Sequence, residues 1–377
     1  MRRVLLVGAT GSIGRSTLDV VRALAPELQL HGIFSASNAA ALGAIGREFG
    51  VRWAGVAEEA ALPALREALP GVRTGAGDAF LREAIADPQT DIVVSAASGA
   101  AGLPASLEAV RRGKRLALAN KESMVLAGPI LLRLAEESGA TILPVDSEHS
   151  AVFQAMQAGR PGEVARILLT ASGGPFRTWS REELARATPE DALRHPTWQM
   201  GRKITVDSAT LMNKALEIVE ARWLFGIPAE RIEVVVHPQS IVHSLVEFVD
   251  GAVLAQMGRP DMRIPIQVAL TWPDRRPPAF TRFHVEDYRQ LTFEEPDRDR
   301  FPALALGERA ARRGGTAGAV LNAANEVCVR RFLAGEIAFP AIARRVGEIL
   351  ERAGIVDDPT LDDIMGADHN AREEASK

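Results

Sequence analysis

The sequence predicts an α/β protein that begins with a doubly wound parallel sheet, continues into an α+β domain and ends in a small helical domain. Three observations lead to this fold class. Short apolar runs alternate with amphipathic segments over residues 1–150, which is typical of parallel strands joined by helices. Residues 151–272 mix helical and strand-like periods, and the apolar residues after 303 recur at helical spacing.

Length and composition are those of an ordinary enzyme. The 377 residues suffice for two or three domains, and a net charge of -4 gives no general attraction for nucleic acid or anionic membranes. Cys328 is the only cysteine, which excludes an intrachain disulfide and a thiolate metal cluster. The chain starts almost directly on a strand and has no apolar run long enough to cross a bilayer, so we expect a cytoplasmic protein.

A glycine-rich turn separates the first predicted strand from the first helix. The apolar run Val4–Val7 is followed by G-A-T-G-S-I-G at residues 8–14 and then by an amphipathic pattern through Leu24. Glycines let the backbone approach a pyrophosphate, and a helix N-terminus supplies N–H donors to it. The pattern predicts a Rossmann-like dinucleotide site, with a tight turn that binds no ligand as the alternative.

The end of the second predicted strand bears on the choice of cofactor. After Leu30–Phe34 the chain reads Ser35, Ala36, Ser37 and Asn38, without an acidic residue to accept from a ribose 2′-hydroxyl. This absence favours NADP over NAD. No Arg or Lys follows to bind a 2′-phosphate, so both cofactors remain open from these residues.

Later strands are expected near 91–95, 115–119 and 141–145, with helices near 104–112 and 129–138. Ligands bind beyond the carboxyl ends of strands in such sheets. Polar residues follow the three strands at Ser98-Gly99, Asn120–Ser123 and Asp146–Glu148. We therefore expect these groups to line one edge of the sheet.

The third of these groups has the composition of a metal site. If the strand continues through it, Asp146 and Glu148 project to one side with roughly 6.5 Å of rise between them. Two such carboxylates favour a hard divalent cation such as Mg²⁺ or Mn²⁺. A helix N-cap before Ala151 is the alternative, and on this stretch alone capping is the more economical interpretation.

The middle of the chain offers further polar candidates. Ser172, Gly173 and Gly174 follow a predicted strand at 167–170 and could hold a phosphate or simply form a turn. Residues 176–203 lack a clean period and predict a lid in which Trp198 covers a ligand. A short helix at 179–192 with an ordinary surface tryptophan is the alternative.

The following segments complete the predicted elements. A helix is expected over Asp207–Phe225, with Asn213, Lys214 and Glu217 on one flank that could be a solvated face. Antiparallel strands are expected at 234–237, 240–248 and 253–256, the first two joined by Pro238-Gln239. Residues 273–302 are rich in proline and charge and predict a linker. Helices are expected at 303–312, 318–333 and 339–352, before a polar end.

Six motifs occur in order along essentially the whole chain. They are G-A-T-G-S-I-G at 8–14, L-A-N-K-E-S at 118–123, V-D-S-E-H-S at 145–150, S-G-G-P-F at 172–176, H-P-T-W at 195–198, and M-N-K with Glu217 at 212–217. In this combination the sequence resembles the 1-deoxy-D-xylulose 5-phosphate reductoisomerase family.

The resemblance implies an enzyme that uses NADPH and a divalent metal to convert 1-deoxy-D-xylulose 5-phosphate to 2-C-methyl-D-erythritol 4-phosphate in non-mevalonate isoprenoid biosynthesis. It implies a homodimer with Mg²⁺ or Mn²⁺, or Co²⁺, as the metal. The implied divisions are an NADPH-binding domain at 1–146, a catalytic domain at 147–272 with a lid at about 176–203, a linker at 273–302, and a helical domain at 303–377.

The resemblance also implies roles for individual residues. The metal ligands are Asp146, Glu148 and Glu217, and Lys121 joins Glu148 and Glu217 as catalytic. The substrate-binding residues are Lys121, Ser147, Glu148, Ser172, His195, Trp198, Ser208, Asn213, Lys214 and Glu217. The cofactor-binding residues are Gly8, Thr10, Gly11, Ser12, Ile13, Gly14, Ala36, Ser37, Asn38, Asn120, Glu122, Gly201 and Met262. Where the family often has a basic residue beside Asn38, this chain has Ser37.

Adding Glu217 reverses the earlier preference for capping, because Asp146 and Glu148 then become two of three acidic ligands. Other classes fit less well. A short-chain dehydrogenase needs a Lys four residues after its Tyr, and Tyr288 is followed there by Thr292. A homoserine-type or semialdehyde-type dehydrogenase is a better alternative, but the cysteine-dependent kind would need Cys328, which lies in a predicted helix. A non-catalytic NADPH sensor has no need of three acidic ligands.

Overall fold

The computed structural model describes residues 1–198, 200–277, 280 and 282–377. Its chain contacts define two compact units, the first formed by 1–123, 131–150 and 261–282, and the second by 124–130, 151–260 and 283–377. The units interleave along the chain, whereas the predicted domains follow it in order. Parts of the predicted lid (Gln199) and of the predicted linker (Pro278, Ala279 and Thr281) lie outside the described residues.

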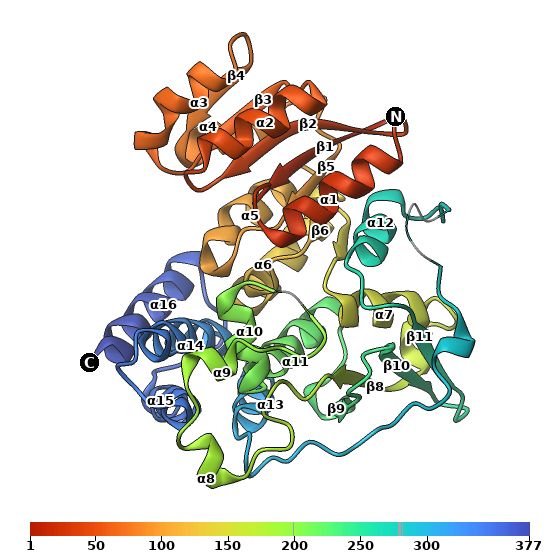
Figure 1. Ribbon diagram of the computed structural model, residues 1–377, viewed down its shortest axis with the longest axis vertical. Helices are drawn as coiled ribbons and strands as arrows, with labels where there is room; N and C mark the ends of the chain where they lie inside the picture. The colour runs from red at the N-terminus through yellow and green to blue at the C-terminus, as the bar shows by residue number, and fades with distance from the viewer. Residues whose placement is uncertain (199, 278–279, 281) are drawn as a thin grey trace. The chain divides into compact units, whose positions relative to one another are not determined.

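The first unit contains the expected parallel sheet (Figure 1). Its seven strands have the order β4-β3-β2-β1-β5-β6-β7, and each neighbouring pair is parallel. The strands are β1 (Arg2–Val7), β2 (Leu28–Ser35), β3 (Trp53–Val56), β4 (Arg73–Ala76), β5 (Ile92–Ser95), β6 (Arg115–Leu118) and β7 (Ile142–Pro144). Strand order reverses beside β1, which is where doubly wound sheets bind ligands. The predicted fold class is confirmed.

Helices connect these strands. They are α1 (Ser12–Ala23), α2 (Ala39–Phe49), α3 (Leu62–Ala68), α4 (Gly77–Ala86), α5 (Leu103–Arg111) and α6 (Lys121–Ser138). A later helix, α12 (Arg263–Thr271), packs against α1, β6 and β7. Arg2 Nη1 donates to the carbonyls of Leu270 and Thr271 at 3.1 and 3.0 Å. A cation at the negative end of α12 helps to explain why this segment belongs to the first unit.

Two local predictions around the sheet edge are wrong. The helix expected at 129–138 begins at Lys121, because the Asn120 side chain caps it by accepting from the Ser123 N–H at 3.0 Å. Pro129 lies inside this helix, near a break in helical geometry at Ala127. Likewise β7 ends at Pro144 and α7 (Ser147–Met156) begins three residues later, so Glu148 lies on a helix and not on a strand end.

The second unit contains a smaller sheet of order β11-β10-β8-β9. Its strands are β8 (Val164–Ala171), β9 (Ile232–Val236), β10 (Val242–Phe248) and β11 (Val253–Met257). The predicted pairing of β9 with β10 is wrong, because β8 lies between them and runs parallel to β9. The predicted linker also joins this sheet through a bridge from Glu294 to Val236.

Helices surround the helix α14 (Ala317–Leu333) in this unit. They are α10 (Arg202–Ala209), α11 (Met212–Phe225), α13 (Ala303–Arg313), α15 (Phe339–Arg352) and α16 (Leu361–Ser376). The single helix expected over 207–225 is two helices, because Leu211 has a φ of 59° between α10 and α11. The end of the chain, which was expected to be only polar, forms α16, and its buried residues include Ile364, Ala371 and Ala375. Residues 179–192 form two short helices, α8 (Arg181–Leu184) and α9 (Pro189–Ala192).

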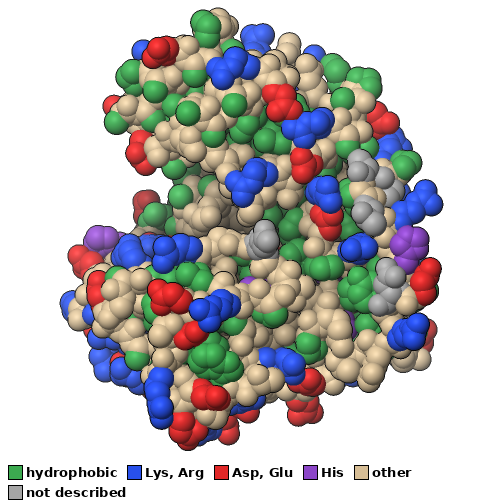
Figure 2. Space-filling model, viewed as in Figure 1, with side chains coloured by type: hydrophobic (Ala, Val, Ile, Leu, Met, Phe, Trp, Pro, Cys, Tyr) green, Lys and Arg blue, Asp and Glu red, His purple; other side chains and the backbone are tan. Residues whose placement is uncertain are grey.

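The surface agrees with the modest net charge. Acidic and basic side chains are interspersed on the face shown in Figure 2. Within the described residues, no helix is both long enough and apolar enough to span a membrane.

Candidate functional site

The glycine turn between β1 and α1 has a geometry that requires glycine. Gly8 has a φ of 88°, and a Cβ there would lie 2.4 Å from the carbonyl oxygen of Ala96. A Cβ on Gly14 would lie 2.4 Å from the Ala9 oxygen, so α1 passes close against the turn. Gly11 is the N-cap of α1 and brings no side chain to the first helical N–H groups. The backbone here can accept an anion such as a pyrophosphate.

The end of β2 carries the four residues predicted beside the adenine ribose. Ala36, Ser37 and Asn38 are exposed, whereas Ser35 is buried. Asn38 caps α2, since its side-chain oxygen accepts from the Ala41 N–H at 3.0 Å. The side chain of Ser37 is therefore the one at this turn that offers an exposed hydroxyl.

Asn120 organises the sheet edge between β5 and α6. Its side-chain amide donates to the carbonyls of Ala97 and Gly99 at 2.7 and 2.9 Å, and to Glu122 Oε2 at 3.0 Å. A Cβ on Gly102 would lie 2.4 Å from Asn120 Cγ, so the loop after β5 packs directly on this side chain. Asn120 and Glu122, both predicted cofactor residues, thus form one bonded group with that loop.

A buried ion pair lies at the start of α6. Lys121 Nζ is 2.5 Å from Asp146 Oδ2, and the two side chains are 6% and 15% exposed. Ser147 donates to Glu148 Oε2 at 2.6 Å on the first turn of α7. The predicted metal ligands Asp146 and Glu148 and the predicted catalytic Lys121 are therefore neighbours in the first unit.

His149 is a functional candidate that sequence analysis did not assign a role. It is fully buried, and its Nδ1 is 4.0 Å from Asp146 Oδ2. Its spacing of three from Asp146 would have revealed this proximity had the region been recognised as a helix start and not as a strand end.

A second buried ion pair lies on α11. Lys214 Nζ bonds to Glu217 Oε2, and the two side chains are 4% and 0% exposed. Asn213 Nδ2 donates to the other oxygen, Glu217 Oε1, at 2.6 Å. These residues do not form a solvated face, so that alternative is wrong. A buried carboxylate is costly unless cations or donors compensate its charge, and both are present here.

His195 joins two hydroxyls from separate elements. Its Nε2 is 3.1 Å from Ser172 Oγ, after β8, and 3.1 Å from Ser208 Oγ, on α10. Its Nδ1 accepts from the backbone N–H groups of Thr197 and Trp198 at 3.1 and 2.9 Å. With Nδ1 as acceptor, the neutral ring carries its proton on Nε2 and presents it to the hydroxyls.

Burial lowers the pKa of His195 from its ordinary value of 6.5, so the ring is neutral at pH 7. Gly173 and Gly174 have φ values of 83° and 67°, which folds their backbone next to Ser172. One imidazole N–H and two hydroxyls thus converge beside a permissive backbone turn. Such a group can donate several hydrogen bonds to an oxyanion such as phosphate.

The remaining predicted residues lie on segments next to these groups. Trp198 packs on His243 of β10, with ring centroids 6.4 Å apart. Gly201 is the N-cap of α10, and Met262 is the N-cap of α12. Thr10, Ser12 and Ile13 belong to the glycine turn and the first residues of α1.

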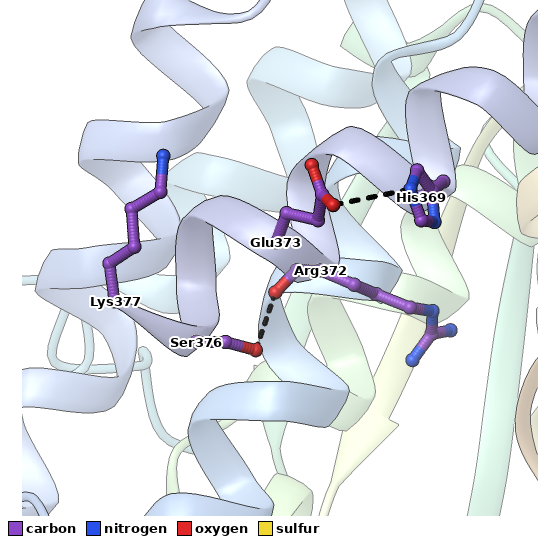
Figure 3. A pocket seen from close by; sticks show the side chains of 5 residues that line it. All are labelled: His369, Arg372, Glu373, Ser376 and Lys377. Atoms are coloured by element: carbon purple, nitrogen blue, oxygen red, sulfur yellow. Dashed lines mark hydrogen bonds and ion pairs between the residues drawn. The ribbon is translucent and has the colours of Figure 1, made fainter.

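A separate hollow of about 470 Å³ lies on α16 and does not resemble a binding site (Figure 3). Its lining is His369, Arg372, Glu373, Ser376 and Lys377, all from α16 and its C-cap. The guanidinium of Arg372 is already bound to Asp368 and Glu326. The hollow therefore offers no cluster of available polar groups comparable to that at His195.

Comparison with protein families accounts for almost the whole chain. Residues 4–128 match the family described as 1-deoxy-D-xylulose 5-phosphate reductoisomerase. Residues 142–225 match its C-terminal domain, and residues 257–374 match the family described as DXP reductoisomerase C-terminal domain.

Full-length relatives and solved structures agree. The chain is 49% identical to 1-deoxy-D-xylulose 5-phosphate reductoisomerase of Ralstonia pickettii, over 100% of this chain and 97% of that protein. It is 50% identical to that of Afipia carboxidovorans, over 100% and 93%. The Zymomonas mobilis enzyme in complex with NADPH superposes with a TM-score of 0.93 at 44% identity, over 100% and 98% of the two chains. A DOX-P reductoisomerase in complex with NADPH, fosmidomycin and magnesium superposes with a TM-score of 0.95 at 38% identity, with the same coverage.

Proposed function

Because this chain belongs to the 1-deoxy-D-xylulose 5-phosphate reductoisomerase family, we propose specific roles for its residues in that family's reaction. The protein is an NADPH- and divalent-metal-dependent reductoisomerase that converts 1-deoxy-D-xylulose 5-phosphate to 2-C-methyl-D-erythritol 4-phosphate. The carboxylates Asp146, Glu148 and Glu217 offer the oxygen ligands that magnesium prefers, and we propose that manganese can take its place. We also propose that the reaction serves isoprenoid biosynthesis.

The observation that carries these roles is the buried lysine–carboxylate pair in each unit. Lys121 compensates Asp146 in the first unit, and Lys214 compensates Glu217 in the second. A buried carboxylate whose charge is compensated by a lysine ammonium group suits a site where a divalent metal ion binds in the active enzyme. We assign Asp146 and Glu148 of the first unit and Glu217 of the second as the metal ligands.

A bound divalent ion would polarise the ketone and the adjacent hydroxyl of the substrate. Lys121, no longer needed to neutralise Asp146, can then hold or move a proton at the ketose oxygens. Ser147 orients Glu148 through their 2.6 Å hydrogen bond.

The second unit supplies the proposed phosphate contacts. Ser172, Ser208 and His195 present two hydroxyls and one N–H, while Lys214 adds a point charge and Asn213 an amide. Trp198 continues directly from the loop that His195 fixes. Its indole can cover the substrate and exclude water from the reaction.

The glycine turn of the first unit supplies the proposed cofactor site. The N–H groups at the start of α1 receive the pyrophosphate of NADPH, and Ser37 and Asn38 lie at the strand end where the adenine ribose binds. Asn120 and Glu122 fix the loop after β5 at the same edge of the sheet.

We also propose that the protein is a homodimer, for which the edge of the smaller sheet gives support. β11 lies at one end of the strand order, and its Val253, Leu254 and Met257 are 51%, 41% and 37% exposed. An exposed apolar edge strand favours pairing with a second copy.

An NADPH oxidation assay tests the function. We expect absorbance loss at the NADPH band when 1-deoxy-D-xylulose 5-phosphate and Mg²⁺ or Mn²⁺ are both present. Omitting the ketose phosphate, or chelating the metal, should abolish the rate. Turnover that persists with the metal removed would contradict the assignment of the three carboxylates.

A further inference from the structure

A buried polar network ties α10 to the central helix α14 in the second unit. Asp207 of α10 is 1% exposed, and its Oδ1 accepts from Asn325 Nδ2 of α14 at 2.8 Å. Its Oδ2 is 2.8 Å from Lys203 Nζ, one turn earlier on α10. Neither Asp207 nor Asn325 belongs to the proposed metal, cofactor or substrate contacts.

The side-chain amide of Asn325 is oriented so that its N–H group donates to Asp207. It is fully buried, and its Oδ1 has no hydrogen-bond partner in the described part of the chain. Flipping the amide would place that oxygen against the Asp207 carboxylate, where two acceptors would face each other. Asn325 therefore donates to Asp207 in the orientation that keeps this hydrogen bond between α14 and α10.

Asp207 is followed directly by Ser208, which bonds to His195. Consecutive residues on a helix point about 100° apart, so fixing Asp207 against α14 also fixes the direction of Ser208. On another side of α10 the backbone meets the turn at Gly173 and Gly174 that follows β8, since a Cβ on Gly174 would lie 2.6 Å from the Ser208 carbonyl oxygen. α10 is thus held between the turn after β8 and the helix α14.

We propose that Asn325 and Asp207 are positioning residues that hold Ser208 in register with His195 and Ser172, and so set the enzyme's affinity for the phosphate of its substrate. The proposal rests on the proposed function, because it assumes that Ser208 and His195 bind that phosphate. The C-terminal helical region then contributes to substrate binding without touching the substrate.

The same helix offers a matched control. Asn322, one turn before Asn325, is also fully buried and also has a side-chain oxygen without a partner among the described residues. Its amide donates to Glu326 Oε1 at 3.0 Å, on α14 itself, and not to α10. Asn322→Ala and Asn325→Ala therefore remove similar buried amides, but only the second releases Asp207.

The test measures kcat, KM for 1-deoxy-D-xylulose 5-phosphate and KM for NADPH in the full-length enzyme with Mg²⁺. For Asn325→Ala we expect KM for the ketose phosphate to rise on the order of tenfold, since a displacement of about 1 Å in a positioned group costs up to about a hundredfold. KM for NADPH should stay within about twofold of wild type. Asn322→Ala should leave both KM values unchanged.

A conservative pair keeps the test decisive if Asn325→Ala folds poorly. Asp207→Asn keeps an oxygen that can accept from Asn325, whereas Asp207→Ala removes it. We expect Asp207→Asn to stay close to wild type in KM for the ketose phosphate and Asp207→Ala to match Asn325→Ala.

Equal effects of Asn322→Ala and Asn325→Ala, or equal rises in both KM values for Asn325→Ala, would overturn the positioning role. So would a similar KM for the ketose phosphate in Asp207→Asn and Asp207→Ala. A wild-type enzyme that fails to oxidise NADPH with this substrate would instead overturn the proposed function. The two failures are therefore distinguishable.

Discussion

The glycine turn of the first unit and the His195 cluster of the second are the two proposed anion sites, and they are built from different groups. The turn relies on backbone, with Gly8 at a φ of 88° and an uncapped helix start at Gly11. The cluster relies on side chains, with His195 bonded to Ser172 and Ser208 from elements far apart in sequence. We assign NADPH to the first and the substrate phosphate to the second.

Because one proposed site uses backbone groups and the other uses side chains, the two should respond differently to substitutions and to pH. A backbone site has no titrating group of its own, but it fails when a Cβ occupies the space that the turn leaves empty. A side-chain site tolerates small backbone changes, but it depends on the protonation of His195 and on the elements that aim each hydroxyl. Variants of the two sites should therefore separate cofactor binding from substrate binding.

The largest expected effect comes from Glu217→Gln, which removes a metal-ligand charge without altering the cofactor site. We expect kcat to fall by about a thousandfold, because a bound metal supplies several kcal/mol of charge stabilisation. NADPH affinity, measured by fluorescence titration, should stay near the wild-type value. Substantial metal-dependent turnover in this variant would remove Glu217 from the ligand set.

Gly8→Ala should damage the cofactor site most. The positive φ costs about 1–3 kcal/mol for a non-glycine residue, and the Cβ would also meet the Ala96 oxygen at 2.4 Å. We expect KM for NADPH to rise by about a hundredfold. Gly162→Ala is the control, because a Cβ there has no neighbour within 4 Å. An unchanged KM for NADPH in Gly8→Ala would contradict the backbone site.

Lys214→Ala should damage the substrate site without affecting the cofactor site. A charge-assisted hydrogen bond to phosphate contributes about 1.5–3 kcal/mol, so we expect KM for the ketose phosphate to rise about thirtyfold. Lys114→Ala is the control, because Lys114 is a part-buried lysine of the first unit that donates to the Asp87 carbonyl at 3.0 Å. Equal increases in both KM values would count against a phosphate role for Lys214.

His195→Asn probes the pH sensitivity of the cluster. The Asn oxygen can still accept from the Thr197 and Trp198 N–H groups, but the Nε2–H donor is lost. We expect KM for the ketose phosphate to rise about tenfold, the effect of about 1.4 kcal/mol, one hydrogen bond. Circular dichroism should show a melting temperature close to that of wild type at pH 8.

The same variant tests the sign of the pH dependence. Because burial lowers the pKa of His195 in the folded state, the unfolded chain binds the proton more readily. The stability contribution of neutral His195 is thus complete above pH 6.5 and decreases as pH falls below it. Urea unfolding at pH 8 and pH 5.5 should show a smaller loss of unfolding free energy in His195→Asn than in wild type. An equal loss would show that other groups control this range.

Ser37→Lys should have the smallest effect and should sharpen the cofactor site. Ser37 is exposed beside the N-cap of α2, where a lysine can approach a ribose 2′-phosphate. An exposed charge pair contributes about 1 kcal/mol, so we expect the preference for NADPH over NADH in kcat/KM to rise about fivefold. An unchanged preference would place the 2′-phosphate away from residue 37.

The sequence predicted the parallel pairing of the first sheet, although not its strands β3 and β4, whereas it predicted the strands of the second sheet but not their pairing. Parallel strands such as β1 and β5 are continuous apolar runs, and the glycine turn has a local signature that pairing cannot alter. The position of β9 depended instead on β8, which is separated from it in the sequence by α8, α9, α10 and α11. A pattern of alternating residues cannot distinguish that arrangement from a hairpin.

The polar residues of the proposed sites also differ in whether a local sequence pattern could predict their surroundings. Motif resemblance assigned roles to Glu217 and His195, whereas local pattern alone made a solvated face the more economical interpretation of Asn213, Lys214 and Glu217. Lys214 and Glu217 are buried in a helix that packs against α13 and α14. A local pattern cannot predict this packing, because α13 and α14 lie far away in the sequence. Asp207 and Asn325 went unnoticed because 118 residues separate the two atoms of their hydrogen bond.

The most direct test of the two-site account is a crossed measurement of both KM values in Gly8→Ala, Lys214→Ala and the double variant. The account predicts that Gly8→Ala raises KM for NADPH alone and that Lys214→Ala raises KM for the ketose phosphate alone. In the double variant each KM should rise by the same factor as in the corresponding single variant. A rise of both KM values in either single variant would contradict the separation of the cofactor and phosphate sites.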